Sequence, residues 1–289
     1  MWRRCIHSSR GALHENPLGL PSRPPPPTIP RRTTGPPEKR AIANVGKLLA
    51  VASGKGGVGK STVAVNLACA LARQKLSVGI LDLDVFGPSL PTLLGLRDAP
   101  EPVLTPQGAL VPLANHGLAC MSMGFLVPGS APVVWRGLMV QKAVQQLLFD
   151  VAWPRLDVLL VDLPPGTGDV ALSLGQLAKV DGAVVVSTPQ DVALLDVQKG
   201  VSAFRKLSIP ILGLVLNMAH FTCPSCATPH RIFGPPHLPE DVDLLAELPV
   251  LPRVSVDGDA GVPPALTDPA VQIVMDPLAR EVWRLLNER

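Results

Sequence analysis

The sequence has no apolar run that approaches the roughly 20 residues needed to cross a bilayer. We therefore expect a soluble protein without an integral membrane segment. The net charge is only +3, and the positive excess lies in the first 40 residues rather than on the body of the chain. This distribution argues against nucleic acid as a partner. The N-terminus also lacks the uninterrupted apolar segment of a secretory signal.

Acidic residues are scarce in the first 40 positions. Against Glu15 and Glu38, this stretch has the basic residues Arg3, Arg4, Arg10, Arg23, Arg31, Arg32, Lys39 and Arg40. An arginine-rich, acid-poor start is typical of a mitochondrial transit peptide, and the Pro24–Pro27 run favours an extended chain. We predict a disordered leader over residues 1–40 that directs the protein to the mitochondrial matrix. The alternatives are an ordinary disordered basic tail and a wrongly assigned start.

What the sequence does contain is a glycine-rich octet, Gly54-Lys55-Gly56-Gly57-Val58-Gly59-Lys60-Ser61, which we call the phosphate loop. The apolar run over residues 48–52 predicts a buried strand before it, and helical periodicity follows it. Strand, glycine-rich turn and helix form the context of a phosphate-binding loop. Backbone N–H groups would surround a phosphate, Lys60 would add positive charge, and the Ser61 hydroxyl would bind Mg²⁺.

A dinucleotide site is the competing interpretation of the same glycines. Gly54-x-Gly56-x-x-Gly59 also fits the dinucleotide fingerprint, with Asp82 about 20 residues further on. However, a dinucleotide site has no use for Lys60 and Ser61 directly after the last glycine, and it does not predict the acidic motifs downstream. The spacing therefore favours a nucleoside triphosphate.

Carboxylates follow two further apolar runs. Asp82 and Asp84 end the run over residues 78–81, and their period-2 spacing places them on one side of the strand end. Asp162 closes the strand predicted over residues 157–162 in the arrangement of a Walker B aspartate, before Gly166-Thr167-Gly168. Such carboxylates suit the Mg²⁺ shell and the positioning of an attacking water. The alternative is that one of them merely caps the next element.

The remaining pattern alternates strands and helices. Strands are predicted near residues 118–123, 182–187 and 211–217, and helices over 135–150, 192–207 and 276–286. This order predicts an α/β fold in residues 41–289, with a doubly wound, mostly parallel sheet, helices on both faces and the phosphate loop at its carboxyl edge. Asn217 would end the last of these strands. Cys69 and Cys120 lie in apolar context and are predicted core residues.

Cys223 and Cys226 form a Cys-x2-Cys pair in the segment 220–234. Two such thiolates can share one metal or cluster, and a symmetric dimer would supply the other half of a four-thiolate site. The alternatives are a disulfide or redox role, and a zinc site completed by His220, His230 or His237. An intracellular setting disfavours the first, and the histidine spacing does not fit a usual zinc template.

Several of these motifs together resemble the Mrp/ApbC iron–sulfur carrier ATPases, including their mitochondrial members that serve respiratory complex I. These are P-loop NTPases of the deviant Walker A (SIMIBI) class, marked by a second lysine at the position of Lys55. The resemblance is carried by the phosphate loop, Asp82–Asp84, Gly87–Ser89, Met121–Phe125, Trp135–Met139, Asp162–Asp169, Asn217-Met218, the cysteine pair and Ile232–Gly234.

The resemblance implies a homodimer that binds ATP and Mg²⁺ and holds a [4Fe–4S] cluster between its subunits on Cys223 and Cys226. The cluster would pass to apoproteins, here complex I subunits. Lys55 would reach the partner's nucleotide, Asp84 would orient the attacking water, and Lys60 would act on the phosphates. Ser61, Asp82 and Asp162 would serve Mg²⁺. The predicted nucleotide-binding residues are Gly54, Lys55, Gly56, Gly57, Val58, Gly59, Lys60, Ser61, Thr62 and Asn217, the last at the adenine edge.

The chain also departs from the family pattern, and two other functions stay open. Ala219 and His220 follow Asn217-Met218, Ala227 replaces a common glycine, and the proline-rich stretch after Gly234 looks like a shortened C-terminal quarter. One alternative is a ParA/MinD-like switch ATPase that positions cargo, which the cysteine pair argues against. The other is a nucleotide-binding scaffold without useful turnover, because P-loop switches are often slow on their own.

Overall fold

The computed structural model describes residues 38–85, 87–126, 137–223 and 225–288. The leader predicted for residues 1–40 lies almost entirely outside these ranges. Phe86, Pro224, Trp135 and Arg136, which belong to the sequence motifs, also lie outside them.

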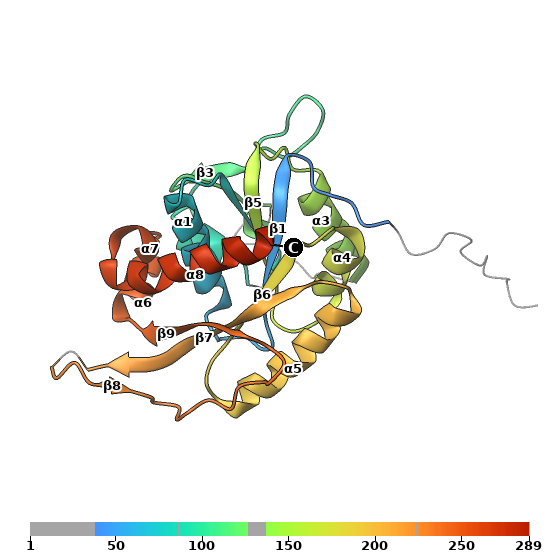
Figure 1. Ribbon diagram of the computed structural model, residues 1–289. Helices are drawn as coiled ribbons and strands as arrows, with labels where there is room; N and C mark the ends of the chain where they lie inside the picture. Colours follow the sequence, from blue (N-terminus) through green and yellow to red (C-terminus); the bar gives the residue numbers. More distant parts are fainter. Residues whose placement is uncertain (1–37, 86, 127–136, 224, 289) are drawn as a thin grey trace, which may run out of the picture. The chain divides into compact units, whose positions relative to one another are not determined.

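A nine-stranded sheet forms the centre of the described chain (Figure 1). Its strands are β1 (Val45–Ser53), β2 (Val78–Asp82), β3 (Leu113–Asn115), β4 (Leu118–Ser122), β5 (Leu156–Asp162), β6 (Gly182–Ser187), β7 (Ile211–Thr222), β8 (Pro229–His230) and β9 (Leu244–Val250). The order is β3-β4-β2-β5-β1-β6-β7-β8, and β9 also pairs with β7. Only β3–β4 and β7–β8 are antiparallel among these pairs, so the predicted mostly parallel sheet is confirmed.

Helices cover both faces of the sheet (Figure 1). They are α1 (Lys60–Arg73), α2 (Leu90–Leu93), α3 (Gly137–Phe149), α4 (Asp169–Leu177), α5 (Asp191–Lys206), α6 (Pro252–Asp259), α7 (Pro264–Thr267) and α8 (Pro269–Asn287), with a 3₁₀ turn at Met123–Phe125. α1, α7 and α8 pack together on one side, and α3 packs against α4 on the other. Coverage of both faces explains why the central strands are continuous apolar runs.

The carboxyl ends of the central strands lie level with one another. Asp82 of β2 is paired in register with Asp162 of β5, and Val51 of β1 is paired with Asp162 on its other side. Ligands of open parallel sheets bind beyond these strand ends. The register therefore brings the acidic residues and the phosphate loop to one edge, as the sequence predicts.

The predicted end of β7 is wrong. The strand does not stop at Asn217 but continues to Thr222, where Phe221 pairs with His230 of β8. At Met218 the backbone has a φ of 56°, and the pairing with β9 shifts register between Leu216 and His220. A residue in this left-handed region locally bends a strand. Asn217 therefore lies within β7, just before an irregularity that redirects the strand toward the cysteine pair.

The C-terminal quarter is more regular than the prolines suggest. β9 and α6 were not predicted, and α8 begins at Pro269 rather than near Asp276. Asp268 caps α8 by accepting a hydrogen bond from the Ala270 N–H, 2.8 Å away. Prolines at the starts of α6, α7 and α8 occupy first-turn positions, where the missing N–H costs little. The prolines thus mark helix starts, not the loss of structure.

Candidate functional site

The phosphate loop leads from β1 into the N-terminus of α1. Gly57 and Gly59 have φ values of 81° and 82°, and Gly59 directly precedes the first residue of α1. Only glycine adopts this conformation without strain. The loop opens on a cavity of about 450 Å³, which we call the phosphate cavity. Backbone N–H groups and the positive end of a helix dipole together make such a cavity suited to anions.

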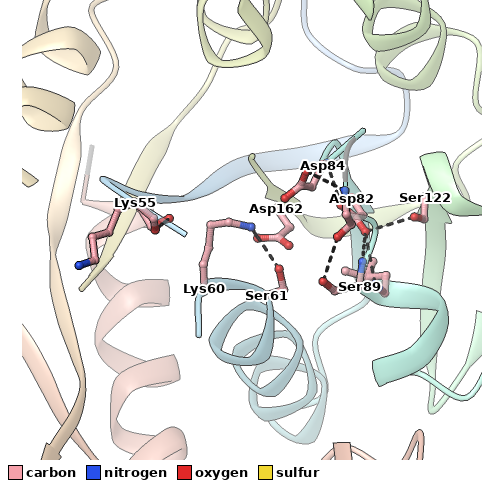
Figure 2. A network of polar contacts seen from close by, with 11 residues as sticks. Lys55, Lys60, Ser61, Asp82, Asp84, Ser89, Ser122 and Asp162 are labelled. Carbon is pink, nitrogen blue, oxygen red and sulfur yellow. Dashed lines mark hydrogen bonds and ion pairs between the residues drawn. The ribbon is translucent and has the colours of Figure 1, made fainter. Parts of the chain in front are cut away.

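Lys60 and Asp162 form a buried ion pair at this cavity (Figure 2). The Lys60 Nζ lies 2.5 Å from Asp162 Oδ1 and 3.1 Å from the Ser61 hydroxyl. Burial raises the pKa of the Asp162 carboxyl above its ordinary value, and the adjacent Lys60 ammonium opposes this shift. The second oxygen, Oδ2, is buried and has no hydrogen-bond partner among the described residues. A buried acceptor without a partner is costly unless a ligand satisfies it.

Asp82 has a different environment from Asp162. Its carboxylate accepts hydrogen bonds from the N–H groups of Asp84, Ser89 and Leu90, and from the Ser122 hydroxyl at 3.2 Å (Figure 2). Burial raises the pKa of Asp82 to about 7, and Asp162 adds to this shift, while the backbone donors oppose it. Asp82 thus accepts hydrogen bonds from the start of α2. This is the capping role that the sequence analysis gave as the alternative for one of the carboxylates. Its predicted role toward Mg²⁺ stays a prediction.

Asp84 lies on the cavity side of the β2 end. Its side chain lines the phosphate cavity together with Lys60 and Ser61, and one carboxylate oxygen accepts a hydrogen bond from the Gly87 N–H at 3.3 Å. Figure 2 shows Asp84 beside Asp82 and across from Lys60. The structure therefore brings Lys60, Ser61, Asp82, Asp84 and Asp162 together at one edge of the sheet.

Lys55 does not join this group of carboxylates. Its side chain points away from Lys60 and Asp162 (Figure 2), while its carbonyl accepts a hydrogen bond from the Ser53 hydroxyl at 3.0 Å. The preceding Gly54 is in close contact with α5, because a Cβ there would lie 2.6 Å from the carbonyl carbon of Asp196. The loop backbone is thus fixed, and the Lys55 side chain is directed outward.

A second cavity of about 330 Å³ adjoins the phosphate cavity beside Gly59. We call it the base cavity, since its walls are largely apolar side chains from α1, β9, α6 and α8. Asn217 lines it, and the Asn217 Nδ2 donates a hydrogen bond to the Val58 carbonyl at 2.9 Å. A Cβ on Gly59 would lie 2.3 Å from the same Nδ2. Asn217 therefore fits against the phosphate loop only because residue 59 is glycine.

Cys223 and Cys226 lie in the turn between β7 and β8, which projects from the edge of the sheet (Figure 1). The Cys223 N–H donates to the Thr228 carbonyl at 3.0 Å, and the Cys223 carbonyl accepts from the Ala227 N–H at 2.8 Å. Ala227 has a φ of 57°. Hydrogen bonds from the Thr228 side chain and backbone lower the pKa of the exposed Cys226 thiol below its ordinary value. Both thiols are free and at least partly accessible.

The predicted zinc alternative finds no support within one chain. In the described ranges, no three His, Cys, Asp or Glu side chains gather closely enough to hold a metal ion. His237 instead contacts Asp191, with 2.8 Å between Nδ1 and Oδ1. Cys69 and Cys120 are both buried in the core, as predicted. In the described part of the chain, no helix is long and apolar enough to cross a membrane.

Two residues of the site escaped the sequence analysis. Ser122 contributes a hydroxyl to Asp82 from β4, 40 residues further along the chain. Asp259, at the end of α6, lines both the phosphate cavity and the base cavity. Ser122 belongs to the Met121–Phe125 motif, but the motif gave it no role, and α6, which carries Asp259, was not predicted. Only the tertiary fold brings these side chains to the site.

Comparison with known proteins identifies relatives along most of the chain. The ParA family model described as NUBPL iron-transfer P-loop NTPase matches residues 44–283. The match thus extends through the C-terminal quarter that the sequence analysis took to be shortened.

Curated relatives are about half identical to this chain over the aligned residues. The iron-sulfur cluster transfer protein NUBPL of Mus musculus is 50% identical over 242 residues, which cover 81% of this chain and 75% of that protein. The iron-sulfur cluster carrier protein of Pseudomonas fragi is 47% identical, with 81% and 83% covered. An iron-sulfur protein of Arabidopsis thaliana, described as mitochondrial and required for NADH dehydrogenase, is 45% identical, with 86% and 81% covered.

Solved structures share the fold. The nucleotide-binding protein of Archaeoglobus fulgidus, in complex with ADP, superposes with a TM-score of 0.69 at 37% identity, and covers 79% of this chain and 91% of its own. The cell division ATPase MinD of Pyrococcus furiosus superposes with a TM-score of 0.60 at 23% identity, over 83% of this chain and 99% of its own. The second likeness concerns the fold alone.

Proposed function

Because the chain belongs to the NUBPL group of ParA-type iron-transfer P-loop NTPases, we propose that it is an ATP-dependent carrier of iron–sulfur clusters. In this proposal two copies hold one [4Fe–4S] cluster between them on Cys223 and Cys226, and pass it to apoproteins. The observation that carries the proposal is the accessible thiol pair in the β7–β8 turn, on the strand that also lines the base cavity.

The phosphate cavity suits a triphosphate better than a dinucleotide. Lys60 is a point charge at the N-terminus of α1, and its present partner is Asp162. Phosphate oxygens would take Lys60 away from Asp162, and the N–H groups of the phosphate loop would bind the same anion. The proposed nucleotide-binding residues are therefore those of the phosphate loop and Thr62, with Asn217 at the base.

Mg²⁺ fits the oxygens of Ser61 and Asp162 beside the ion pair of Lys60 and Asp162. The Asp162 Oδ2 is a buried oxygen without a protein donor among the described residues, and the Ser61 hydroxyl is close to Lys60. Ser61 and Asp162 would hold the ion, directly or through its water shell. When bound, Mg²⁺ neutralises charge on the β- and γ-phosphates. Asp82 is the weaker candidate ligand, because four protein donors already occupy its carboxylate.

Hydrolysis would depend on Asp84 and on the two lysines. Asp84 lines the phosphate cavity, where its carboxylate would orient the attacking water. Lys60 would stabilise charge on the transferred phosphoryl group. Lys55 points away from its own carboxylates (Figure 2), an orientation compatible with contact to the nucleotide of a partner subunit. Turnover is expected to be slow, as in other P-loop switches without a partner.

The cluster is the cargo of the protein, and the turn between β7 and β8 suits it chemically. Thiolates are the ligands of iron–sulfur clusters, and hydrogen bonding lowers the pKa of the Cys226 thiol. One chain offers two thiolates here, which is half of a four-thiolate set, so a second copy would complete it.

The relatives support a proposal for the receiving apoproteins and the compartment. One relative is described as mitochondrial and required for NADH dehydrogenase, so we infer delivery to subunits of respiratory complex I in the mitochondrial matrix. The leader over residues 1–40 would direct the protein there, and residues 41–289 would form the working domain. A MinD-like switch function has only the shared fold in its favour.

Anaerobic reconstitution of the full chain with iron and sulfide tests the carrier function. We expect about four irons and four sulfides per dimer for the wild type, and neither cluster nor cluster-dependent dimer for the Cys223→Ser/Cys226→Ser variant. Iron, sulfide, zinc and oligomer mass are measured together. Cys69→Ala, a cysteine variant outside the turn, serves as the matched control. A monomer that takes zinc, or an unchanged iron content in the double variant, would refute the shared cluster.

A further inference from the structure

The base cavity and the phosphate cavity meet at four residues, Gly59, Thr62, Leu93 and Asp259. A nucleotide that places its base in one cavity and its phosphates in the other must lay its ribose across this boundary. Among the described residues that line both cavities, Asp259 is the only ionisable one. We propose that Asp259 binds the ribose hydroxyls and makes the site specific for ribonucleotides. This assignment rests on the proposed nucleotide site.

Asp259 is an exposed carboxylate at a position that is electrostatically unfavourable for it. It is the last residue of α6, where the helix dipole is negative and a carboxylate is disfavoured. Asp259 also lines the phosphate cavity, where its negative charge would repel a bound polyphosphate. A carboxylate there disfavours phosphate binding, unless the same group gains hydrogen bonds from the ligand. Ribose hydroxyls are the donors that a nucleotide presents at that point.

The backbone around Asp259 is held in place by close contacts. A Cβ on Gly261 would lie 2.4 Å from the Cα of Gly95, and Gly261 has a φ of 75°. The Gly261 carbonyl also contacts His116 Nε2 at 2.9 Å, and a Cβ on Gly258 would lie 3.3 Å from Leu93. These contacts from both sides fix the end of α6 against the loop after α2. A carboxylate on so fixed a backbone is preorganised for a small, directional ligand group.

Asp259 is the only charged candidate among the described residues of the base cavity, because Thr62, the other polar side chain at the boundary, offers a neutral hydroxyl. The other described lining residues of this cavity are uncharged, and the side-chain amide of Asn66 on α1 already makes two hydrogen bonds. The Asn66 Oδ1 accepts from the Ala265 N–H at 2.8 Å, and its Nδ2 donates to the Thr62 carbonyl at 2.8 Å. Ser255 lines only the base cavity. A hydrogen bond to a charged acceptor discriminates more strongly than one to a neutral group, which favours Asp259.

Equilibrium binding of ATP, 2′-deoxy-ATP and 3′-deoxy-ATP to the full chain tests the assignment. The wild type should bind at least one deoxynucleotide about tenfold or more weakly than ATP, because the loss of a hydrogen bond to a charged group costs at least that factor. In Asp259→Ala this ratio should fall to about one, as ATP loses the same contact. Asp259→Asn should keep part of the discrimination.

Asp257→Ala is the matched control, since Asp257 lies on the same helix, pairs with Arg253 at 3.9 Å and lines neither cavity. It should keep the wild-type ratio. Equal affinity of the wild type for all three nucleotides, or full discrimination in Asp259→Ala, would overturn the assignment. A wild type that binds none of the three would instead refute the nucleotide site, and the ribose role with it.

Discussion

At the scale of single residues, the stability of the buried ion pair depends on Lys60 being present to compensate the charge of Asp162. Lys60→Ala leaves a fully buried carboxylate without its positive partner. Loss of one member of a buried pair typically costs about 3–5 kcal/mol. We expect a loss of this order in urea unfolding near neutral pH, together with Mg-ATP binding weakened by at least about tenfold.

The loss in Lys60→Ala should shrink in acid. Burial raises the pKa of Asp162, so a protonated side chain relieves the unpaired charge as the pH falls. Lys55→Ala is the matched control, because it removes a lysine of the same loop whose side chain points away from the carboxylates. This variant should unfold like the wild type. A Lys60→Ala variant that binds Mg-ATP as tightly as the wild type would refute the assignment of the phosphate loop.

Asp82 gives the protein a pH dependence of opposite sense to that of a salt-bridged carboxylate. Its pKa is raised from 3.8 to about 7 in the folded state. The folded protein therefore holds the proton more tightly than the unfolded chain, so this contribution to stability is complete below about pH 4 and is lost as the pH rises to about 7. The slope should approach at most about 1.4 kcal/mol per pH unit.

Urea unfolding of the nucleotide-free protein between pH 4 and 8 measures this slope. Asp82→Asn should flatten it and also lower stability, because an amide cannot accept from all four donors. Asp157→Asn, an exposed carboxylate that accepts from the Ser77 N–H, should keep the wild-type slope. An equal slope in the wild type and Asp82→Asn would show that Asp82 does not titrate in this range.

The residues predicted from the sequence are those whose role is encoded locally. The phosphate loop, Asp84 and Asp162 follow directly from a strand and its turn, so their convergence could be predicted from the parallel order of the strands. The division of labour between Asp82 and Asp162 could not, because it depends on Ser122 of β4 and on the start of α2. Asp259 was missed for the same reason.

At the scale of elements, β9 joins the base cavity to the cysteine turn. Its residues from Leu248 onward line the base cavity, while Glu247 contacts Arg231, which directly follows β8. The Arg231 Nη2 lies 2.9 Å from Glu247 Oε2, and both guanidinium nitrogens reach Oε1 within 3.3 Å. This forked contact fixes the return arm of the turn to a strand of the nucleotide site.

We expect Arg231→Glu to destabilise the bound cluster more than the protein. Bleaching of the visible absorbance of the reconstituted cluster should become several-fold faster, while the unfolding free energy changes by less than about 1 kcal/mol, as is usual for an exposed ion pair. The swapped pair, Arg231→Glu with Glu247→Arg, should restore the slow rate. Arg205→Glu breaks an exposed pair with Asp241 elsewhere and should not affect bleaching. No rescue by the swap would mean that the contact does not position the turn.

Predictability at this scale depends on how regular the pattern is. β6 lies at its predicted residues 182–187. It was predictable because its small and β-branched residues form one continuous buried run. β9 contains Glu247 and Pro249 and lies at the edge of the sheet, so neither alternation nor continuous apolarity marks it. The extension of β7 past Asn217 depends on pairing with β8 and β9, which no local signal reveals.

At the scale of the whole molecule, the first 40 residues differ in composition from the rest of the chain, with many basic residues and few acidic ones. The body is anchored at its start: the Arg40 N–H donates to the Leu177 carbonyl, the Arg40 carbonyl accepts from Lys179, and the guanidinium lies 4.1 Å from the Phe149 ring centroid. The family model begins at residue 44. Targeting information is therefore expected in the residues before this anchor.

Residues 1–40 fused to a fluorescent reporter should bring it into the mitochondrial matrix, because basic, acid-poor leaders are drawn in by the membrane potential. The matched control carries Arg3→Glu, Arg4→Glu and Arg10→Glu in the same fusion, and should stay in the cytosol. Imaging with a matrix marker and protease protection distinguish the two. A cytosolic wild-type fusion would rule out the proposed leader.

The ion pair of Lys60 with Asp162 also bears on which anions the phosphate cavity attracts. With the ammonium already neutralised, a lone inorganic phosphate would have to separate two opposite charges and leave the carboxylate bare in a buried position. Mg-ATP brings an anion for Lys60 and a cation for Asp162 at once, so binding is an exchange of counterions rather than a separation of charge. We therefore expect the pair of Lys60 and Asp162 to disfavour inorganic phosphate as a lone ligand of the phosphate cavity, while leaving Mg-ATP binding favourable.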